Sequence, residues 1–309
     1  MSVLLVFAMI WALGAEARFN QPPLGLDIYM PVPTTNPLTR EKISRGRQLF
    51  FDKRLSRDET LSCASCHQPK LAFSDGRAHA RGIDGAEGTR NSPSLINRGY
   101  GEVFFWDGRA QSLEELALQP ILNPRELDNT ESELERRTGM RAADVAAALA
   151  SYLRTIRSGD SRFDRYAAGQ TGVLNALEKE GLAVFRGKGG CTSCHIGPNF
   201  TDERFHNTGV AWRDGRLTDE GRFALSEIER DRGAFKTPTL RDIVRTAPYM
   251  HDGSLATLDD VIEFYSQGGR RNPYLDPAIA ARNLTVQEKL ALAAFVRTLT
   301  GRLREGTGN

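Results

Sequence analysis

The pattern of apolar and polar positions along the chain predicts helices joined by long loops. In residues 39–51, 142–158 and 285–300, apolar side chains recur every three or four positions, as in helices that bury one face. Alternation with a period of two is scarce, so the sequence predicts a mainly α fold. Five prolines within residues 19–37 predict an extended lead-in, because proline disrupts helix interiors.

The first residues form an apolar run followed by a cleavage pattern of small residues. Val3–Leu13 is too short to span a bilayer, and Gly14–Ala17 contains an A-x-A sequence, so residues 1–17 are predicted to be a cleaved signal peptide. No Lys or Arg precedes the run, which leaves a membrane anchor as the alternative. No other segment is apolar enough to span a membrane, and a net charge of +2 gives no argument for a nucleic-acid partner.

The sequence C-x-x-C-H occurs twice, and all four cysteines belong to these two motifs. The motif residues are Cys63, Cys66, His67, Cys191, Cys194 and His195. This spacing is typical of c-type haem attachment, in which both thiols bond to the haem and the histidine binds its iron. A zinc site made from the two C-x-x-C pairs and a pair of disulfides are the alternatives, but neither needs a histidine after each second cysteine. We therefore expect two covalent haem c groups and export from the cytoplasm.

The segments around the motifs repeat one plan, which predicts two domains of similar architecture. In each, a helix with glycine four residues before phenylalanine precedes the motif, and a helix bearing an aromatic residue follows the loops. The matching positions are Gly46 and Phe50 with Gly181 and Phe185, and Tyr152–Ile156 with Phe295–Leu299. Glycine lets another helix approach closely, as in class I cytochrome c domains. We expect domains at residues 18–165 and 166–309, with the boundary near residues 159–172.

Helix ends are predicted from capping patterns. Ser112 with Glu115 and Thr285 with Glu288 form S/T-x-x-E capping boxes. Pro120 and the Asn-Pro pair after it are expected to end the helix that begins after Ser112.

The sixth ligands of the two irons decide between an electron carrier and an enzyme. The remaining candidates are Met30, Met140, Met250, His79, His206 and His251. None of these methionines lies in the loop before a closing helix, where carrier cytochromes place their axial methionine. A lone histidine is more often a hydrogen-bonded structural residue than a ligand. An iron without a strong sixth ligand is open to peroxide, which indicates an enzyme.

Four further segments, together with the two haem motifs, form a set of motifs in a fixed order. They are residues 90–93 (RNSP), 105–109 (FWDGR), 123–126 (NPRE) and 247–253 (APYMHDG). In this order, the set resembles the bacterial di-haem cytochrome c peroxidase and MauG family over most of the mature chain. The resemblance implies two cytochrome c-like domains, with haems near the domain interface, and a periplasmic location.

The resemblance implies roles for residues near the first haem, on His67. Glu126 matches a distal glutamate that moves a proton between peroxide oxygens, which is general acid–base work. The alternative for Glu126 is a solvated turn residue. Trp106 matches a tryptophan between the haems that carries electrons or a transient hole, and its alternative is a core aromatic residue.

The resemblance also implies further metal ligands. Asn91, Thr246 and Pro248 match an inter-haem calcium site built from oxygen atoms. In the family, the residue fourteen positions after the histidine of P-Y-x-H-D-G is methionine in cytochrome c peroxidases and tyrosine in MauG-like members. Here it is Tyr265, which would bind the second iron and lower its potential. The alternative for Tyr265 is core packing on an amphipathic helix.

Two departures from the family pattern change the expectations. Leu116 stands where members usually have glutamine, which removes a hydrogen-bond donor from the distal pocket. His79 lies near, but not at, the position of a distal histidine in cytochrome c peroxidases. We expect the first haem to be open without prior reduction; if His79 reaches the iron, the enzyme would need activation.

The sequence therefore leads to three functional hypotheses. In the first, a MauG-like enzyme uses hydrogen peroxide at the first haem and oxidises a partner protein by long-range electron transfer through the second. In the second, a cytochrome c peroxidase reduces hydrogen peroxide with electrons from a small cytochrome c or a cupredoxin. In the third, the chain is a non-enzymatic di-haem electron carrier. A homodimer is common in the peroxidase branch.

Overall fold

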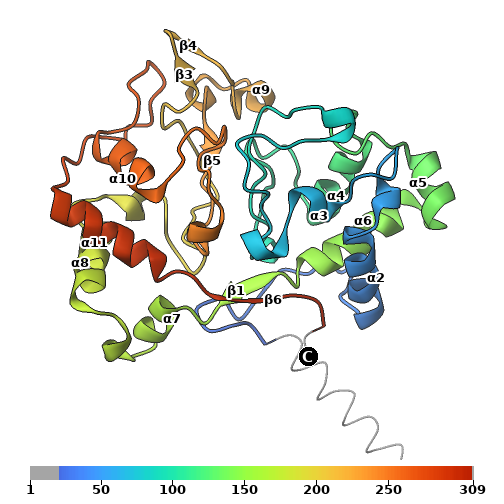
Figure 1. The fold of residues 1–309 in the computed structure, drawn as a ribbon, viewed down its shortest axis with the longest axis horizontal. Helices are drawn as coiled ribbons and strands as arrows, with labels where there is room; N and C mark the ends of the chain where they lie inside the picture. The colour runs from blue at the N-terminus through green and yellow to red at the C-terminus, as the bar shows by residue number, and fades with distance from the viewer. Residues whose placement is uncertain (1–20, 308–309) are drawn as a thin grey trace, which may run out of the picture.

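The computed structural model describes residues 21–307, so the signal peptide predicted at residues 1–17 lies outside the described residues. The described chain forms two mainly helical lobes, which stand side by side above a pair of strands (Figure 1). Residues 21–39 contain no helix, as their prolines predict. The mainly α fold class is thereby confirmed. Within residues 21–307, no helix has both the length and the apolar character needed to cross a membrane.

The elements follow one another along the chain in a simple order, with η marking 3-10 helices. The first lobe contains α2 (Arg40–Phe50), η1 (Lys53–Leu55), α3 (Cys63–Cys66), η2 (Pro69–Leu71), η3 (Ile83–Gly85), η4 (Arg98–Tyr100), α4 (Leu113–Leu122), α5 (Glu131–Thr138) and α6 (Ala142–Leu153). The connection between the lobes contains β1 (Arg157–Gly159), α7 (Arg162–Ala167) and η5 (Thr171–Val173). The second lobe contains α8 (Ala176–Arg186), η6 (Cys191–Ser193), β2 (Phe205–His206), β3 (Trp212–Arg213), β4 (Arg216–Leu217), α9 (Phe223–Ser226), η7 (Glu229–Asp231), β5 (Phe235–Lys236), η8 (Ile243–Arg245), α10 (Leu258–Ser266) and α11 (Val286–Arg297), and β6 (Arg302–Arg304) follows.

In each lobe, two helices pack together at the predicted glycine. α2 packs on α6, and a Cβ atom added to Gly46 would lie 1.9 Å from the carbonyl oxygen of Ala148. α8 packs on α11, and a Cβ atom on Gly181 would lie 1.9 Å from the carbonyl oxygen of Ala291. The helices therefore meet backbone to backbone, which only glycine allows, and the predicted close approach is confirmed.

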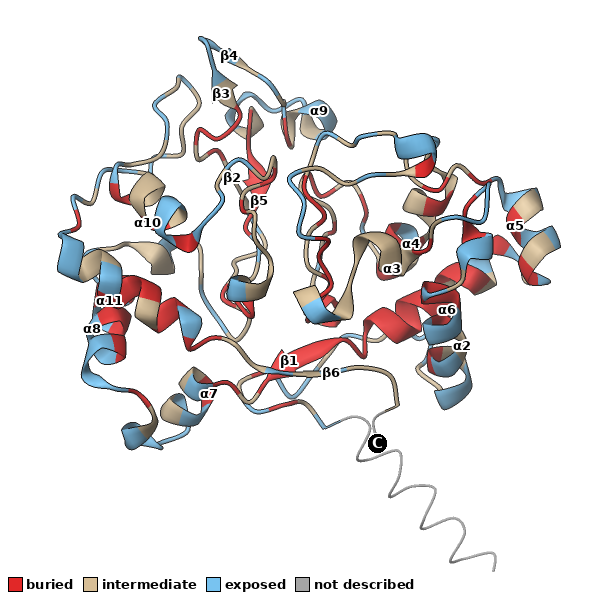
Figure 2. Cartoon of the chain, viewed as in Figure 1, coloured by how far each residue is buried: buried red, intermediate tan, exposed pale blue. Residues whose placement is uncertain are grey.

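Each lobe has its own hydrophobic core. The buried residues of the first core run from Leu49 to Ile156, and those of the second from Leu182 to Leu299. Figure 2 shows that α6 and β1 are almost entirely buried. Phe163 of α7 packs against the second core, so the chain passes from one core to the other shortly before it. The domain limits at residues 165 and 166, and the cytochrome c character of each domain, stay predictions.

The later parts of the loops between the paired helices, which begin near residues 91 and 236, also repeat at a spacing of 145 residues. The bridge between residues 104 and 110 in the first lobe corresponds to the bridge between residues 249 and 255 in the second. Phe105 and Met250, which are likewise 145 positions apart, both have positive φ, at 65° and 75°. This register makes Trp106 the counterpart of His251. The sequence patterns described above predict the repeat in the helices but not in these loops.

The end of the chain returns to the first lobe. β6 pairs antiparallel with β1 beneath the two lobes, with Leu303 opposite Ser158 (Figure 1). Leu303 packs against the first core. Glu305 accepts hydrogen bonds from Tyr152 and, at 3.2 Å, from Arg47. The C-terminal strand therefore joins the lobes and covers part of the first core.

One predicted helix is too long in the sequence analysis. The helix expected over residues 142–158 ends at Leu153. Ser158 instead lies in β1, where its backbone N–H donates to the Asn97 side chain and its hydroxyl donates to Asp242. Pairing with distant residues therefore outweighs the local helical pattern.

Two details of the helix-end predictions are wrong. Pro120 lies inside α4 and does not end it, because a proline near the C-terminal end removes only one helical hydrogen bond. Glu115 caps the backbone N–H of Gln111, at 2.7 Å, and not that of Ser112, so the expected reciprocal box is incomplete. The other capping box, formed by residues 285 and 288, is confirmed.

We expect Gly181→Ala to destabilise the protein by about 1–3 kcal/mol, because the added methyl group would overlap the Ala291 backbone. Thermal unfolding followed by circular dichroism measures this loss. Gly172→Ala is the matched control, since a Cβ atom there would contact nothing within 4 Å. Equal melting temperatures for the two variants would contradict the role given to Gly181.

Candidate haem sites

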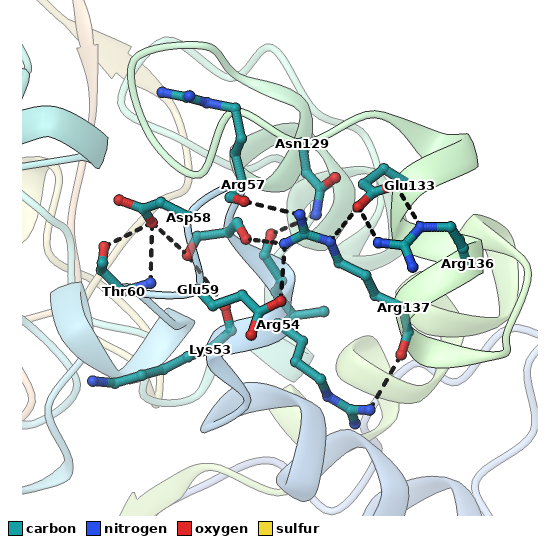
Figure 3. Close-up of polar contacts among 12 residues, drawn as sticks. Lys53, Arg54, Arg57, Asp58, Glu59, Thr60, Asn129, Glu133, Arg136 and Arg137 are labelled. Atoms are coloured by element: carbon teal, nitrogen blue, oxygen red, sulfur yellow. Dashed lines mark hydrogen bonds and ion pairs between the residues drawn. The ribbon is translucent and has the colours of Figure 1, made fainter.

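The segment that leads to the first motif is held by Arg137 of α5 (Figure 3). Its guanidinium donates to the backbone carbonyls of Ser56, at 2.8 Å, and Arg57, at 2.9 Å. The same side chain donates to Glu133 at 2.6 Å. These bonds tie the loop after η1 to α5, and the first motif follows a few residues later.

The first motif forms the short helix α3, with His67 at its C-terminal end. The hydroxyl of Ser65 accepts a hydrogen bond from the backbone N–H of Ser62, which fixes the start of the helix. The Nδ1 atom of His67 lies 2.8 Å from the carbonyl oxygen of Phe73. Burial lowers the pKa of His67, which favours the neutral ring. With Nδ1 donating to the carbonyl, Nε2 is the nitrogen that can bind iron.

The second motif has the same arrangement. The Nδ1 atom of His195 lies 2.8 Å from the carbonyl oxygen of Phe200, and burial lowers the pKa of this histidine too. Phe73 and Phe200 both have positive φ, at 59° and 52°. The two motif histidines are therefore oriented by equivalent bonds, as expected for two equivalent metal ligands.

The thiols fit haem attachment better than the alternatives. All four cysteines are free of disulfide bonds. Burial raises the pKa of Cys63 to about 12 and those of Cys66 and Cys191 to about 11, so these three thiols are neutral. Among the described residues, no group of possible metal ligands combines the two C-x-x-C pairs. The residues present therefore fit two haem c groups and not a shared zinc ion.

Cys194 does lie in a cluster with Asp202 and His206, whose possible ligand atoms are within 4.8 Å of one another. His206 has both ring nitrogens engaged, with Nε2 2.9 Å from Asp202 and Nδ1 2.7 Å from Asp276. It is therefore a hydrogen-bonded structural histidine, as the sequence analysis favoured, and Cys194 keeps its place in the haem motif.

A cavity of about 280 Å³ borders the second motif and is lined from both lobes. Tyr265 of α10 lines it together with His195, Cys191 and Cys194. Burial raises the pKa of Tyr265, and the neighbouring Cys194 and Cys191 raise it further. The structure thus brings Tyr265 and the second motif together at one cavity. Met250 lines the same cavity.

Glu126 lies in a turn beside the first motif. Its backbone carbonyl accepts a hydrogen bond from Ile83, at 2.8 Å, and a Cβ atom added to Gly82 would lie 2.8 Å from its Cα atom. Its carboxylate accepts a hydrogen bond from Asn123 at 2.7 Å. Burial raises the pKa of Glu126, and its charge in turn raises the pKa of Cys66. Glu126 is therefore half-buried near the motif, not the freely solvated turn residue of the alternative.

The structure shows what surrounds Leu116 and His79, the two residues that depart from the family pattern. Leu116 is buried and lines the cavity. One helical turn further along α4, Gln119 accepts a hydrogen bond from Arg109 at 3.1 Å. His79 lies 3.4 Å from Glu87, and the expectation that the first haem is open stays a prediction.

Trp106 lies where the two lobes meet. Its indole Nε1 donates to the carbonyl of Asn91 at 2.9 Å, and the backbone N–H of Asn91 donates to the carbonyl of His251 at 2.7 Å. Its ring meets that of His251 edge to face, with centroids 6.5 Å apart. His251 in turn stacks on Phe235 at 3.6 Å. Trp106 also lines the cavity, and its role between the haems stays a prediction.

The three candidate calcium ligands lie on the same cavity. Asn91, Thr246 and Pro248 all line it, and the side-chain amide of Asn91 is 3.5 Å from the Pro248 carbonyl oxygen. An amide oxygen and two backbone carbonyls are ligands that suit calcium. The amide nitrogen of Asn91 also donates to the carbonyl of Arg77 at 2.6 Å, which fixes the orientation of the amide, and the calcium site stays a prediction.

Several residues that organise the site were missed by the sequence analysis. Ser94 donates to the carbonyl of Ala72 at 2.5 Å, and Thr239, 145 positions later, donates to the carbonyl of Asn199 at 2.6 Å. Each accepting residue directly precedes the phenylalanine that orients a motif histidine. The signal was present as the repeated pattern S/T-P-S/T-L in residues 92–95 and 237–240.

Two C-x-x-C-H motifs with equivalent histidine geometry, in two lobes around a shared cavity, define a di-haem c-type protein. Residues 40–172 match the family model described as di-haem cytochrome c peroxidase. The chain is 39% identical to the methylamine utilization protein MauG of Methylorubrum extorquens, covering 92% of this chain and 84% of the relative. It is 36% identical to the cytochrome-c peroxidase IdrP1 of Denitromonas iodatirespirans, covering 94% and 89%.

Among solved structures, a MauG-like protein associated with microbial copper homeostasis matches with a TM-score of 0.82 and 35% identity, over 91% of this chain and 93% of that one. The chain belongs to the di-haem cytochrome c peroxidase and MauG family of enzymes. The resemblance stated from the sequence is confirmed, and the hypothesis of a non-enzymatic carrier is not retained. Two c-type haems are accordingly the cofactors of this family.

We expect the double variant Cys191→Ala/Cys194→Ala to carry one covalent haem per chain where the parent chain carries two. Each motif attaches its own haem, since the motifs lie in separate lobes. Pyridine haemochrome absorbance per chain measures the number. The variant Cys63→Ala/Cys66→Ala is the matched control and gives the same number; two covalent haems in either variant would contradict the assignment.

Proposed function

We propose that the chain is a MauG-like enzyme that uses hydrogen peroxide at the first haem site and oxidises a partner protein by long-range electron transfer through the second. The observation that carries this proposal is Tyr265, which lines the same cavity as His195. A phenolate oxygen is a hard anionic ligand that favours oxidised iron and lowers its potential. A methionine at this position would favour reduced iron instead.

The haems, once attached, supply the iron chemistry, and the chain supplies the proton transfers and the path between them. Glu126 is proposed to move the proton of peroxide, and its burial beside the first motif supports this role. Trp106 is proposed to carry electrons between the lobes. Its hydrogen bond to Asn91 and its contact with His251 hold the indole in one orientation, which supports that role.

The remaining expectations complete the proposal. A calcium ion held by Asn91, Thr246 and Pro248 would fix the two lobes relative to each other, because these residues come from both. The two domains are proposed to span residues 18–165 and 166–309, and residues 1–17 to direct the chain to the periplasm. A homodimer belongs to the same set of expectations.

The second candidate is a cytochrome c peroxidase that reduces hydrogen peroxide to water with electrons from a small cytochrome c or a cupredoxin. The similarity to relatives named cytochrome-c peroxidase, at 36% identity for one of them, favours this candidate. The two candidates differ at the second haem. Tyrosine ligation supports protein oxidation, and its absence would support peroxide reduction.

We expect Tyr265→Met to raise the midpoint potential of the second haem by on the order of 0.1 V or more, since axial ligands shift haem potentials over a range of about 0.8 V. The variant should also shorten the lifetime of the spectral change that peroxide produces in the fully ferric protein. Spectroelectrochemical titration and stopped-flow absorbance measure the two effects.

The control for this experiment is Tyr249→Phe. Tyr249 lines the same cavity, but its hydroxyl donates to the carbonyl of Ile243 at 3.0 Å. Its variant should leave the potential unchanged. If Tyr265→Met also leaves the potential unchanged, Tyr265 is not a ligand and the second candidate takes precedence.

We expect Glu126→Gln to slow the reaction with peroxide by about 10²-fold or more, the usual contribution of a general acid–base group. Burial raises the pKa of Glu126, so its carboxylate form, which accepts the proton, becomes populated only at higher pH than for a free glutamate. In the parent protein the rate should therefore rise with pH through this raised pKa. In the variant this rise should be lost.

Stopped-flow rate constants measured across the pH range test the prediction. Glu131→Gln is the matched control, because Glu131 is an exposed residue in the first turn of α5. A Glu126→Gln variant with the rate and pH profile of the control would remove Glu126 from the mechanism.

A further inference from the structure

The 145-residue register of the loops pairs Asn91 with Lys236. Asn91 is the side chain proposed to hold a calcium ion in the first lobe, and it lines the cavity. At the equivalent position in the second lobe, Lys236 also lines the cavity and is only 8% exposed. The positively charged side chain of Lys236 thus stands at the position equivalent to Asn91, the proposed calcium ligand.

The other two candidate calcium ligands have counterparts as well. Thr246 corresponds to Gly101, and Pro248 corresponds to Val103. Arg98 fills this region, because it donates to the Val103 carbonyl at 3.0 Å and lies 2.0 Å from where a Cβ atom on Gly101 would be. Its guanidinium and the Lys236 ammonium therefore occupy the equivalent of the proposed calcium site.

These two cations share a single carboxylate. Glu203 accepts from Arg98 at 2.8 and 3.0 Å and from Lys236 at 3.4 Å. Arg98 and Lys236 both line the cavity, whereas Glu203 is not among the described residues that do. Burial lowers the pKa of Lys236 to about 7, and Glu203 only partly offsets this. A second anion on the cavity side would compensate the buried charge.

The other arginines on the cavity are already engaged. Arg241 forms a buried ion pair with Asp164 at 2.9 Å. Arg282 lies beside Gly190 and Cys191, at the edge where the haem would be attached, and donates to the Ala278 carbonyl. Arg282 is half-buried, whereas Arg98 and Lys236 are both buried and share the one carboxylate of Glu203.

We propose that Arg98 and Lys236 bind a carboxylate side chain of the haem attached to Cys191 and Cys194, and that these two cations stand at the position equivalent to that of the proposed calcium ion. A haem c carries two carboxylates, and a charge-assisted bond to each cation is the ordinary way to bury one. Because Arg98 comes from the first lobe and Lys236 from the second, the bound carboxylate links the lobes.

The proposal rests on haem attachment in the second lobe, which both candidate functions share, and not on the identity of the sixth ligand. Its test therefore fails independently of the test of Tyr265. The positive charge of Lys236 favours the reduced, less positive iron. Removing that charge should stabilise the ferric state and lower the potential of the second haem.

The experiment compares Lys236→Met with Lys236→Arg in the fully loaded protein. We expect Lys236→Met to lower the equilibrium constant for reduction of the second haem by about tenfold, the size expected for one charge at short range in a partly polar site. Lys236→Arg should restore it. Spectroelectrochemical titration measures both haems, and resonance Raman spectroscopy follows the bending modes of the haem carboxylates.

Three results would overturn the proposal. The first is an unchanged potential and unchanged carboxylate modes in Lys236→Met. The second is an equal shift in both variants, which would show an effect of packing and not of charge. The third is a shift confined to the first haem. If Lys236→Met does not mature, the pair Arg98→Gln and Arg98→Lys gives the same comparison, with the same expected directions.

Discussion

The hydrogen bond from each motif histidine to a phenylalanine carbonyl is the interaction on which the site depends. It fixes the tautomer and the ring orientation of His67 and His195 and leaves Nε2 as the nitrogen that would bind a haem iron. The phenylalanine that accepts it has positive φ in both lobes, which costs about 1 kcal/mol or more for a residue with a side chain. The hydroxyl groups of Ser94 and Thr239, bonded to the preceding carbonyls, hold that conformation.

The same frame therefore occurs twice, and function lies in the positions where the copies differ. Trp106 faces His251 across the interface, although the register makes them equivalent. Tyr265 of α10 has no tyrosine counterpart in α4, where the same register reaches Pro120. Two copies of one frame that differ at a few cavity residues would give the two proposed haems different environments.

Much of this organisation could be predicted from the sequence, because it follows from local patterns. Gly46 and Gly181 predicted where the helices cross, and the cysteine spacing predicted the haem motifs. What could not be predicted depends on residues far apart in the chain. Ser158 lies in β1 and not in the predicted helix, because it forms hydrogen bonds with Asn97 and Asp242. These partners are far away in the sequence and are recognisable only in three dimensions.

The site shows the same division between local and distant information. The resemblance of the motifs to the family pointed to Glu126, Trp106 and Tyr265. Neither the burial of Glu126 against Gly82 nor the shared cavity of Tyr265 and His195 follows from spacing alone.

The return of β6 to the first lobe has a consequence for biosynthesis. Leu303 and Glu305 follow the first lobe by about 150 residues, so on a growing chain that lobe would acquire its outer cover only once β6 has been synthesised.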